Sequence, residues 1–198
     1  SWTKVDGAKS YIIYRSELKD GKWTKWVSLG TAKSTAKSFT DKTVKSGVQY
    51  KYTIRAKNGS SKSSYIDSNT SIFLSVPTVK IANAATGVKV TWGKIEGAKN
   101  YLVYRSEYNS STKKWSKWKT LETVDTTSFV DETAVSNVKY KYTVRALNGE
   151  FRSYYTASAE LLYLKAPIVT AEKEDEAIKV SWTKVDGAKS YIIYRSEL

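Results

Sequence analysis

Apolar and polar residues alternate along much of this chain with a period of two. From Val48 to Lys57 the even-numbered positions are apolar and the odd-numbered positions are polar. The same alternation returns from Val138 to Leu147, and only its last position departs from the pattern. Because side chains on a strand point alternately to its two faces, this pattern predicts antiparallel sheets that are packed on one face and solvated on the other.

Short turn signals separate the alternating segments. Asp6-Gly7 and Glu96-Gly97 lie between two predicted strands, while Asn58-Gly59 and Asn148-Gly149 follow a tyrosine-rich strand and predict hairpin turns. The strands predicted after Pro77 cover residues 79–82, 88–93, 101–106, 115–123, 128–130, 138–147 and 154–164. Seven short strands without a helical segment predict an all-β fold, an immunoglobulin-like sandwich.

The chain also repeats itself with a period of 90 residues. Its first eighteen residues, Ser1–Leu18, return unchanged as Ser181–Leu198, and a diverged copy begins at Thr91. A fixed period of domain size is typical of tandem arrays. We therefore expect a domain over residues 1–75 that lacks its first strand, a complete domain over 76–165, and strands A to C of a third repeat over 166–198. The two identical segments are expected to have the same structure.

Three strand motifs resemble those of fibronectin type III domains. They are Trp92 on the second strand, the run Tyr101–Arg105 on the third, and the Tyr-x-Tyr-x-Val-x-Ala run Tyr140–Ala146. More narrowly, the chain is similar to the tandem type III modules of Gram-positive bacterial surface and secreted proteins. The resemblance covers the whole chain and implies tandem sandwiches of about 90 residues each, located outside the cell. It implies no particular function, because this fold carries many.

The same resemblance implies roles for two sets of aromatic residues. Tyr50 and Tyr140 correspond to tyrosine-corner residues, whose hydroxyls bond the backbone near the preceding turn. Trp2, Trp92 and Trp182 correspond to core tryptophans of the second strand.

The composition excludes much of the chemistry on which enzymes depend. Cysteine and histidine are both absent, which removes disulfides, thiolate nucleophiles, the commonest general base and most zinc ligands. No pair of carboxylates can be placed at catalytic separation from the sequence. We therefore expect neither an enzyme nor a site for a metal or a cofactor. No apolar run approaches the roughly 18 residues that span a bilayer, and no signal peptide is recognisable.

The net charge of +14 belongs mainly to the first repeat. Residues 1–90 contain sixteen Lys and Arg against five Asp and Glu, a net of +11, whereas residues 91–180 have fourteen against twelve. Basic side chains attract anionic polymers without specific contacts. These lysines are scattered over predicted outward faces and loops, and no nucleic-acid recognition motif accompanies them. Solvated faces and protected sheet edges explain them more economically, which disfavours nucleic acid as a partner.

A Trp-x-x-Trp motif supplies the first candidate binding residues. It occurs in both repeats, as Trp23 and Trp26 and as Trp115 and Trp118. Residues three apart on one strand face opposite sides, so we expect one ring of each pair to be buried and the other exposed. The exposed ring either stacks on a sugar or an aromatic partner, or it covers a sheet edge or an adjacent domain.

Tyr14 and Tyr104 are the second candidate. Each alternates with buried-type residues on its strand, so each is expected on the outward face, within a modest apolar patch. Such a patch serves either in packing or in contact with a partner.

Together these features favour a structural or adhesive repeat region of an extracellular or cell-surface protein. It would act as a semi-rigid spacer that displays other domains. The alternative is an accessory module that binds carbohydrate or a cell-wall polymer through exposed Trp and Tyr and basic sheet faces. The expected partners are neighbouring repeats, a second copy of the chain through the incomplete terminal domains, and cell-wall or glycan polymers.

Overall fold

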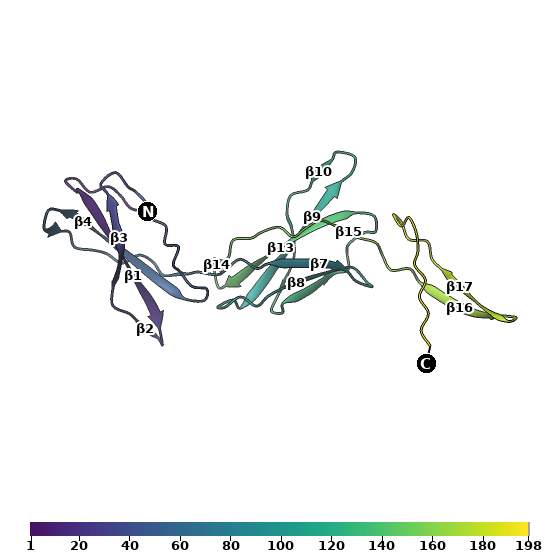
Figure 1. Ribbon diagram of the computed structural model, residues 1–198. Coiled ribbons are helices and arrows are strands. Elements are labelled where there is room, and N and C mark those ends of the chain that lie inside the picture. The colour runs from purple at the N-terminus through teal and green to yellow at the C-terminus, as the bar shows by residue number, and fades with distance from the viewer. Residues whose placement is uncertain (198) are drawn as a thin grey trace. The chain divides into compact units, whose positions relative to one another are not determined.

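The computed structural model describes residues 1–197 as strands and turns, and no helix occurs among them (Figure 1). Leu198, the last residue of the predicted third repeat, lies outside the described residues. The chain forms two compact units. One comprises Ser1–Ser75, Ile95–Lys99 and Ala146–Tyr154, and the other comprises the rest. No helix in the described range is long and apolar enough to cross a membrane.

The second repeat contains two sheets. One sheet has the strand order β12-β8-β7 and the other β10-β9-β13-β14, with β11 beside β9 and β15 beside β13. The bounds are β7 Val79–Asn83, β8 Val88–Trp92, β9 Asn100–Asn109, β10 Lys114–Trp115, β11 Lys119–Val124, β12 Ser128–Asp131, β13 Lys139–Asn148, β14 Phe151–Arg152 and β15 Leu161–Leu162.

The inner faces of these two sheets form the core of the second repeat. Val88 and Val90 on β8 are fully buried, and so are Tyr142 and Val144 on β13. Trp92, which ends β8, is 6% exposed, so this core tryptophan is placed as predicted. Alternation in the sequence therefore gives the correct inward face for both strands.

The first repeat has one sheet, formed by six strands. Its order is β2-β1-β4-β5, with β3 beside β1 and β6 beside β4. The bounds are β1 Ser10–Lys19, β2 Lys22–Trp23, β3 Val27–Lys33, β4 Gln49–Asn58, β5 Ser61–Lys62 and β6 Ser71–Ile72. Residues 38–41 correspond to β12 but form no strand. β12 is held in place because it pairs with β8, and beside residues 38–41 the chain has no β8 within its described part.

The third repeat contributes an antiparallel pair, β16 (Val169–Glu174) and β17 (Ala177–Trp182). Trp182 is 39% exposed, so the expectation that it is a core tryptophan is wrong. No second sheet covers β17 within the described residues, because the pair forms a sheet of its own. Trp2, the remaining tryptophan that was expected in a core, is half-buried.

The two identical eighteen-residue segments differ in structure. Residues 10–18 belong to β1, which pairs with β3 and β4, whereas residues 190–197 form no strand. The contacts local to the segment are kept. Trp2 packs on Tyr11 at 5.4 Å between ring centroids, and Trp182 packs on Tyr191 at 5.5 Å. The expectation of equal structure is wrong because this strand requires partner strands that the segment itself does not encode.

Both tyrosine corners are confirmed. The hydroxyl of Tyr50 accepts a hydrogen bond from Lys45 N at 2.8 Å, and that of Tyr140 accepts one from Val135 N at 2.8 Å. Each bond joins the start of a long strand to the turn five residues before it.

Two of the predicted strands are shorter than expected. The prediction for residues 115–123 is divided into β10 and β11, and in the prediction for 154–164 only β15 forms. At both places a serine hydroxyl accepts a bond from the backbone of the neighbouring strand. Glu107 N donates to Ser116 Oγ at 3.0 Å, and Tyr142 N donates to Ser158 Oγ at 3.0 Å. Regular strand pairing is interrupted there because a side chain accepts the bond.

We expect Ser158→Ala to lower the free energy of unfolding by about 1–3 kcal/mol, because the buried N–H of Tyr142 loses its acceptor. Ser68→Ala is the matched control, since Ser68 accepts from Tyr52 N at an exposed site where water can replace the hydroxyl. Urea denaturation followed by Trp fluorescence measures both. Equal losses for the two variants would contradict this role of burial.

Candidate functional site

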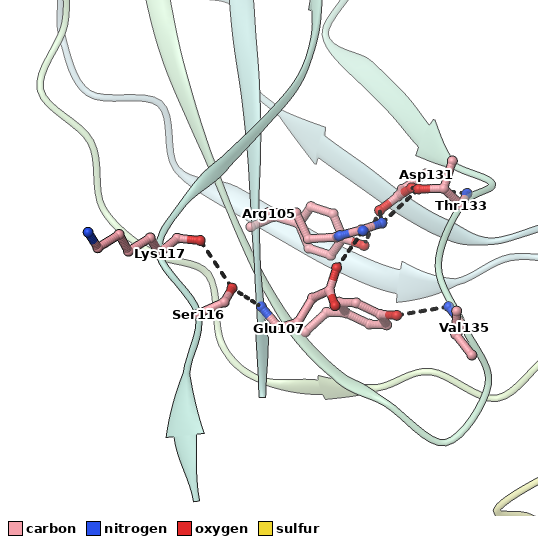
Figure 2. A network of polar contacts seen from close by, with 9 residues as sticks. Arg105, Glu107, Ser116, Lys117, Asp131, Thr133 and Val135 are labelled. Atoms are coloured by element: carbon pink, nitrogen blue, oxygen red, sulfur yellow. Dashed lines mark hydrogen bonds and ion pairs between the residues drawn. The ribbon is translucent and has the colours of Figure 1, made fainter. Parts of the chain in front are cut away.

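An arginine on one sheet of the second repeat reaches an aspartate on the other sheet. Arg105 lies on β9, Asp131 ends β12, and Arg105 Nη1 donates to Asp131 Oδ2 at 2.8 Å (Figure 2). Tyr142 on β13 donates its hydroxyl to the same oxygen at 2.8 Å. The side chains of Arg105 and Asp131 are only 6% and 1% exposed. We call these three residues, with Glu107 and Thr133, the cross-sheet clamp.

Both oxygens of the buried carboxylate accept hydrogen bonds. Thr133 donates to Asp131 Oδ1 from its backbone N at 3.1 Å and from Oγ1 at 2.7 Å. The guanidinium of Arg105 donates to three acceptors, because besides Asp131 it bonds Thr133 Oγ1 at 2.7 Å and pairs with Glu107. Arg105 Nε has no hydrogen-bond partner within the described residues. The other polar atoms of the pair are hydrogen-bonded, and removing one partner of such a buried pair leaves the other charge without compensation.

The first repeat contains the same clamp with greater exposure. Arg15 Nη1 donates to Asp41 Oδ2 at 2.8 Å, and the Tyr52 hydroxyl donates to that oxygen at 3.0 Å. Thr43 donates to Asp41 Oδ1 from its backbone N and its hydroxyl, at 2.9 and 2.7 Å. Glu17 pairs with Arg15 Nη2 at 2.6 Å. The exposed fractions of the Arg15 and Asp41 side chains are 14% and 7%.

In the first repeat the clamp lowers the pKa of its aspartate. Burial by itself raises the pKa of Asp41, because it penalises the charged form. Hydrogen bonds from Thr43, Arg15 and Tyr52 outweigh that effect and lower the pKa to about 2.

In the second repeat the clamp also lowers the pKa of its aspartate. Burial opposes ionisation of Asp131, but hydrogen bonds from Thr133, Arg105 and Tyr142 hold its pKa below the ordinary value. Burial, followed by the bond to this carboxylate, raises the pKa of Tyr142. Asp131 is therefore ionised and Tyr142 protonated at neutral pH.

The clamp is suited to stabilising the sandwich. A general base needs a free lone pair directed at a substrate, and the lone pairs of Asp131 are occupied from within the fold. No group of three or more His, Cys, Asp and Glu in the described range could hold a metal ion.

A second arrangement lies on the outward face of the first repeat's sheet. Lys51 Nζ lies 4.9 Å from the ring centroid of Trp23 and 5.5 Å from that of Trp26. Trp26 meets Tyr65 edge-on at 5.9 Å, and the guanidinium of Arg55 lies 6.0 Å from the Tyr65 centroid. We call these five residues the aromatic–cationic row of the first repeat.

The second repeat has an equivalent row. Lys141 Nζ lies 4.3 Å from the centroid of Trp115. Trp118 meets Tyr155 edge-on at 6.0 Å, and Arg145 lies 4.7 Å over Tyr155. Cation–π contacts of this kind contribute about 0.5–1 kcal/mol each at exposed sites.

The structure contradicts the expected split of each Trp-x-x-Trp pair between two faces. Trp23 and Trp26 approach the same ammonium group, and none of the four rings is buried. The intervening Thr24 is the reason. Its hydroxyl accepts from Glu17 N at 3.0 Å, strand β2 ends at Trp23, and the alternation is broken before β3 begins. Trp23 is 37% exposed, while Trp26, Trp115 and Trp118 are half-buried.

The outward placement of Tyr14 and Tyr104 agrees with the alternation. Both are half-buried; Tyr14 follows the buried Ile13, and Tyr104 lies between the buried Val103 and Arg105. Tyr14 pairs with Thr53 of β4, whose strand neighbours on that face are Lys51 and Arg55. Tyr14 therefore shares the sheet face that carries the row. Its use in binding remains a hypothesis, as does that of the four tryptophans.

Sequence analysis missed the clamp and the basic half of each row. The sequence contained a signal for the clamp, because Arg15 and Asp41 recur 90 residues later as Arg105 and Asp131. A recurring aspartate beside a turn indicates a turn residue first, and the aspartate also has that role through Thr43 and Thr133.

Comparison with solved structures finds fibronectin type III domains. A two-domain segment of chicken tenascin is 18% identical, covering 80% of this chain and 86% of its own, with a TM-score of 0.44. An Fn3-like protein from Clostridium thermocellum is 24% identical, covering 46% and 88%, with a TM-score of 0.33. The FN1–FN3 domains of chicken CNTN1 are 14% identical, covering 92% and 69%, with a TM-score of 0.35.

No protein-family model and no curated protein sequence matches the chain. The class is defined by the strand order. A β7-β8-β12 sheet facing a sheet ordered β10-β9-β13-β14 is an immunoglobulin-like sandwich, an architecture that fibronectin type III domains share. The predicted all-β fold is confirmed by the strands themselves, and the second repeat has both sheets of the predicted sandwich.

The low pKa of the clamp aspartates gives stability a defined pH dependence. Because the folded pKa of Asp41 is lowered from 3.8 to about 2, its contribution is fully present above about pH 4 and is lost as the pH falls through about 2. Urea midpoints at pH 5, 4, 3 and 2 measure this. The double variant Asp41→Asn, Asp131→Asn should flatten the profile in that window. An unchanged profile in the double variant would show that other carboxylates dominate.

Proposed function

We propose that this chain is a structural repeat region of an extracellular or cell-surface protein, in which stable sandwiches act as a spacer that displays other domains. Tandem sandwiches form a repeat module, and in this chain the hydrogen bonds and ion pairs of the clamp stabilise that module. The bacterial surface setting comes from the sequence resemblance described above.

The cross-sheet clamp is the observation that carries this proposal. Arg105 and Tyr142 belong to one sheet and Asp131 to the other, so separating the sheets breaks two charge-assisted hydrogen bonds. In the first repeat Arg15 makes the equivalent ion pair with Asp41 at 2.8 Å, although Asp41 lies in a segment that forms no strand. A spacer needs each repeat to resist opening. Enzymatic activity needs free catalytic groups, and the buried ionisable groups of the clamp are engaged with one another.

Asp131→Asn should weaken the second repeat against both denaturant and force. Loss of the charge leaves Arg105 buried without a full counter-ion, which costs about 3 kcal/mol. In single-molecule pulling of the full chain, the second repeat should unfold in one step that releases about 300 Å for roughly 90 residues. The variant should unfold at lower force.

Asp67→Asn is the matched control for the pulling experiment. Asp67 pairs with Lys51 at 2.7 Å, but its side chain is 40% exposed, so the expected loss is below about 1 kcal/mol. Gradual extension of the unmodified chain without a discrete step would overturn the spacer proposal.

The aromatic–cationic row supports a second candidate, a module that binds an acidic polysaccharide. Exposed rings offer flat faces for sugars, and Lys and Arg offer charges for carboxylates. The row of the first repeat is the better candidate, because Trp23 is 37% exposed and residues 1–90 carry a net charge of +11. Polysaccharide binding is the second choice of function, because Lys51 and Lys141 already cover indole rings of their own repeats.

Titration with polygalacturonate and with the neutral polymer dextran separates the two candidates. If the row binds, polygalacturonate alone should change Trp fluorescence, and salt should weaken the effect. Trp23→Ala should then reduce binding more than its matched counterpart Trp115→Ala. No response to either polymer would eliminate the second candidate and leave the spacer proposal standing.

A further inference from the structure

The compact unit that contains the first repeat also includes two segments of the second. Besides Ser1–Ser75 it comprises Ile95–Lys99, which forms the turn before β9, and Ala146–Tyr154, which contains the turn after β13. The two turns are joined to each other, because Asn148 Nδ2 donates to Gly97 O at 2.7 Å. A pair of linked turns from one repeat therefore packs with the repeat before it.

One serine forms hydrogen bonds on both sides of this contact. The hydroxyl of Ser46 accepts from Ser75 N at 3.0 Å and donates to Glu96 O at 2.8 Å. Ser75 lies near the end of the first repeat, two residues before Pro77, whereas Glu96 belongs to the turn before β9. Because a hydroxyl is both a donor and an acceptor, one side chain links the end of a repeat to a turn of the next.

Two glycines bring the backbones together beside this serine. Gly47 and Gly97 both have a φ of 81°. A Cβ on Gly97 would lie 2.1 Å from Gly47 Cα, so no side chain fits there unless the backbone shifts. Gly7, the counterpart of Gly97 in the first repeat, has a φ of 76° and would place its Cβ with nothing within 4 Å in the described chain. The turn is therefore similar in both repeats, and the close approach belongs to the contact.

The same contact recurs 90 residues further along the chain. Ser136 Oγ accepts from Lys165 N at 3.1 Å and donates to Asp186 O at 2.9 Å. These three residues belong to the other compact unit. A Cβ on Gly187 would lie 2.5 Å from Asn137 Oδ1. The pattern of hydrogen bonds is kept although the residues of the two turns differ, so it is a property of the repeat.

Burial follows this contact more closely than it follows the local sequence. Val185, in the turn that Ser136 bonds, is 6% exposed, whereas Val5, in the identical eighteen-residue segment, is 46% exposed. The backbone N of this valine donates to a tyrosine hydroxyl in both copies, at 2.9 Å to Tyr11 and at 2.7 Å to Tyr191. Only the turn at Val185 has the serine bond within the described residues. The serine contact therefore accompanies the burial of the valine.

We propose that the Ser46-Gly47 turn is a docking surface for the Glu96-Gly97 turn of the following repeat, and that this contact restricts motion at the junction. The serine supplies one hydrogen bond to each side, and the glycines permit the close approach of the two backbones. Neighbouring domains move relative to one another unless their contact prevents it. The inference rests on the proposed spacer function, because a spacer needs stiff junctions as well as stable repeats.

The distance between two spin labels measures motion at this junction. The chain contains no cysteine, so labels can be attached at Lys33→Cys and Lys89→Cys, two exposed positions in different repeats. Double electron–electron resonance then gives the distribution of label distances, which should be narrow. Gly97→Ala should widen it at least about twofold, because the added methyl group collides with Gly47 and releases the junction.

Gly7→Ala is the matched control for Gly97→Ala. It adds the same methyl group to the same kind of turn, at a φ of 76° instead of 81°, but the methyl group meets no neighbour. The distribution of label distances should therefore stay narrow. Equal widening in both variants would overturn the docking contact, because strain within the turn would then be the cause. An unchanged width in Gly97→Ala would overturn it as well.

Ser46→Ala is a milder second variant that keeps both glycines. It removes the donor to Glu96 O and the acceptor for Ser75 N, so it should also widen the distribution. No widening would overturn the role of the serine. Urea transitions followed by Trp fluorescence report whether each variant is folded. A broad distribution in the unmodified chain would overturn the docking contact and leave the spacer proposal to the pulling experiment, which measures the resistance of a single repeat.

Discussion

The buried carboxylate at the edge between the two sheets is the constraint on which the second repeat depends. Asp131 accepts from Arg105, Tyr142 and Thr133, which come from the other sheet and from its own turn. Desolvating one charge costs several kcal/mol, so the group is tolerated only while all these donors are in place. The carboxylate thereby fixes the position of β12 against β9 and β13, which non-directional apolar packing alone does not do.

The first repeat shows what the clamp achieves where the segment that carries its aspartate forms no strand. Arg15, Asp41 and Tyr52 keep their hydrogen bonds, although residues 38–41 form no strand. The side-chain network is therefore independent of strand pairing at this position. Burial is not independent of it, since Tyr52 is half-buried while its counterpart Tyr142 is fully buried. Polar bonds set the geometry, and apolar packing sets how much of the core is protected from water.

The sequence alone predicted the structure correctly wherever a residue's contact partner lies close to it in the chain or belongs to a repeated pattern. Alternation located the inward faces, and the tyrosine corners join residues only five apart. The sequence alone was insufficient where the contact partner belongs to a distant part of the chain. The segment Ser1–Leu18 keeps its Trp–Tyr contact in both copies, yet residues 10–18 form a strand only where β3 and β4 are available. The Trp-x-x-Trp prediction failed because a threonine or serine hydroxyl replaced a backbone acceptor and broke the alternation.

The aromatic–cationic rows illustrate why exposed aromatic residues do not by themselves indicate a ligand. Lys51 covers two indoles, and Arg145 covers Tyr155, so each ring already has a cation on one face. A sugar would have to use the other face or displace the cation, and displacement loses a contact that stabilises the sheet. Trp23, with 37% exposure and the more basic repeat around it, is where a ligand would lose least. The same contacts that protect the outer face of the sandwich therefore limit how well that face can bind a polymer.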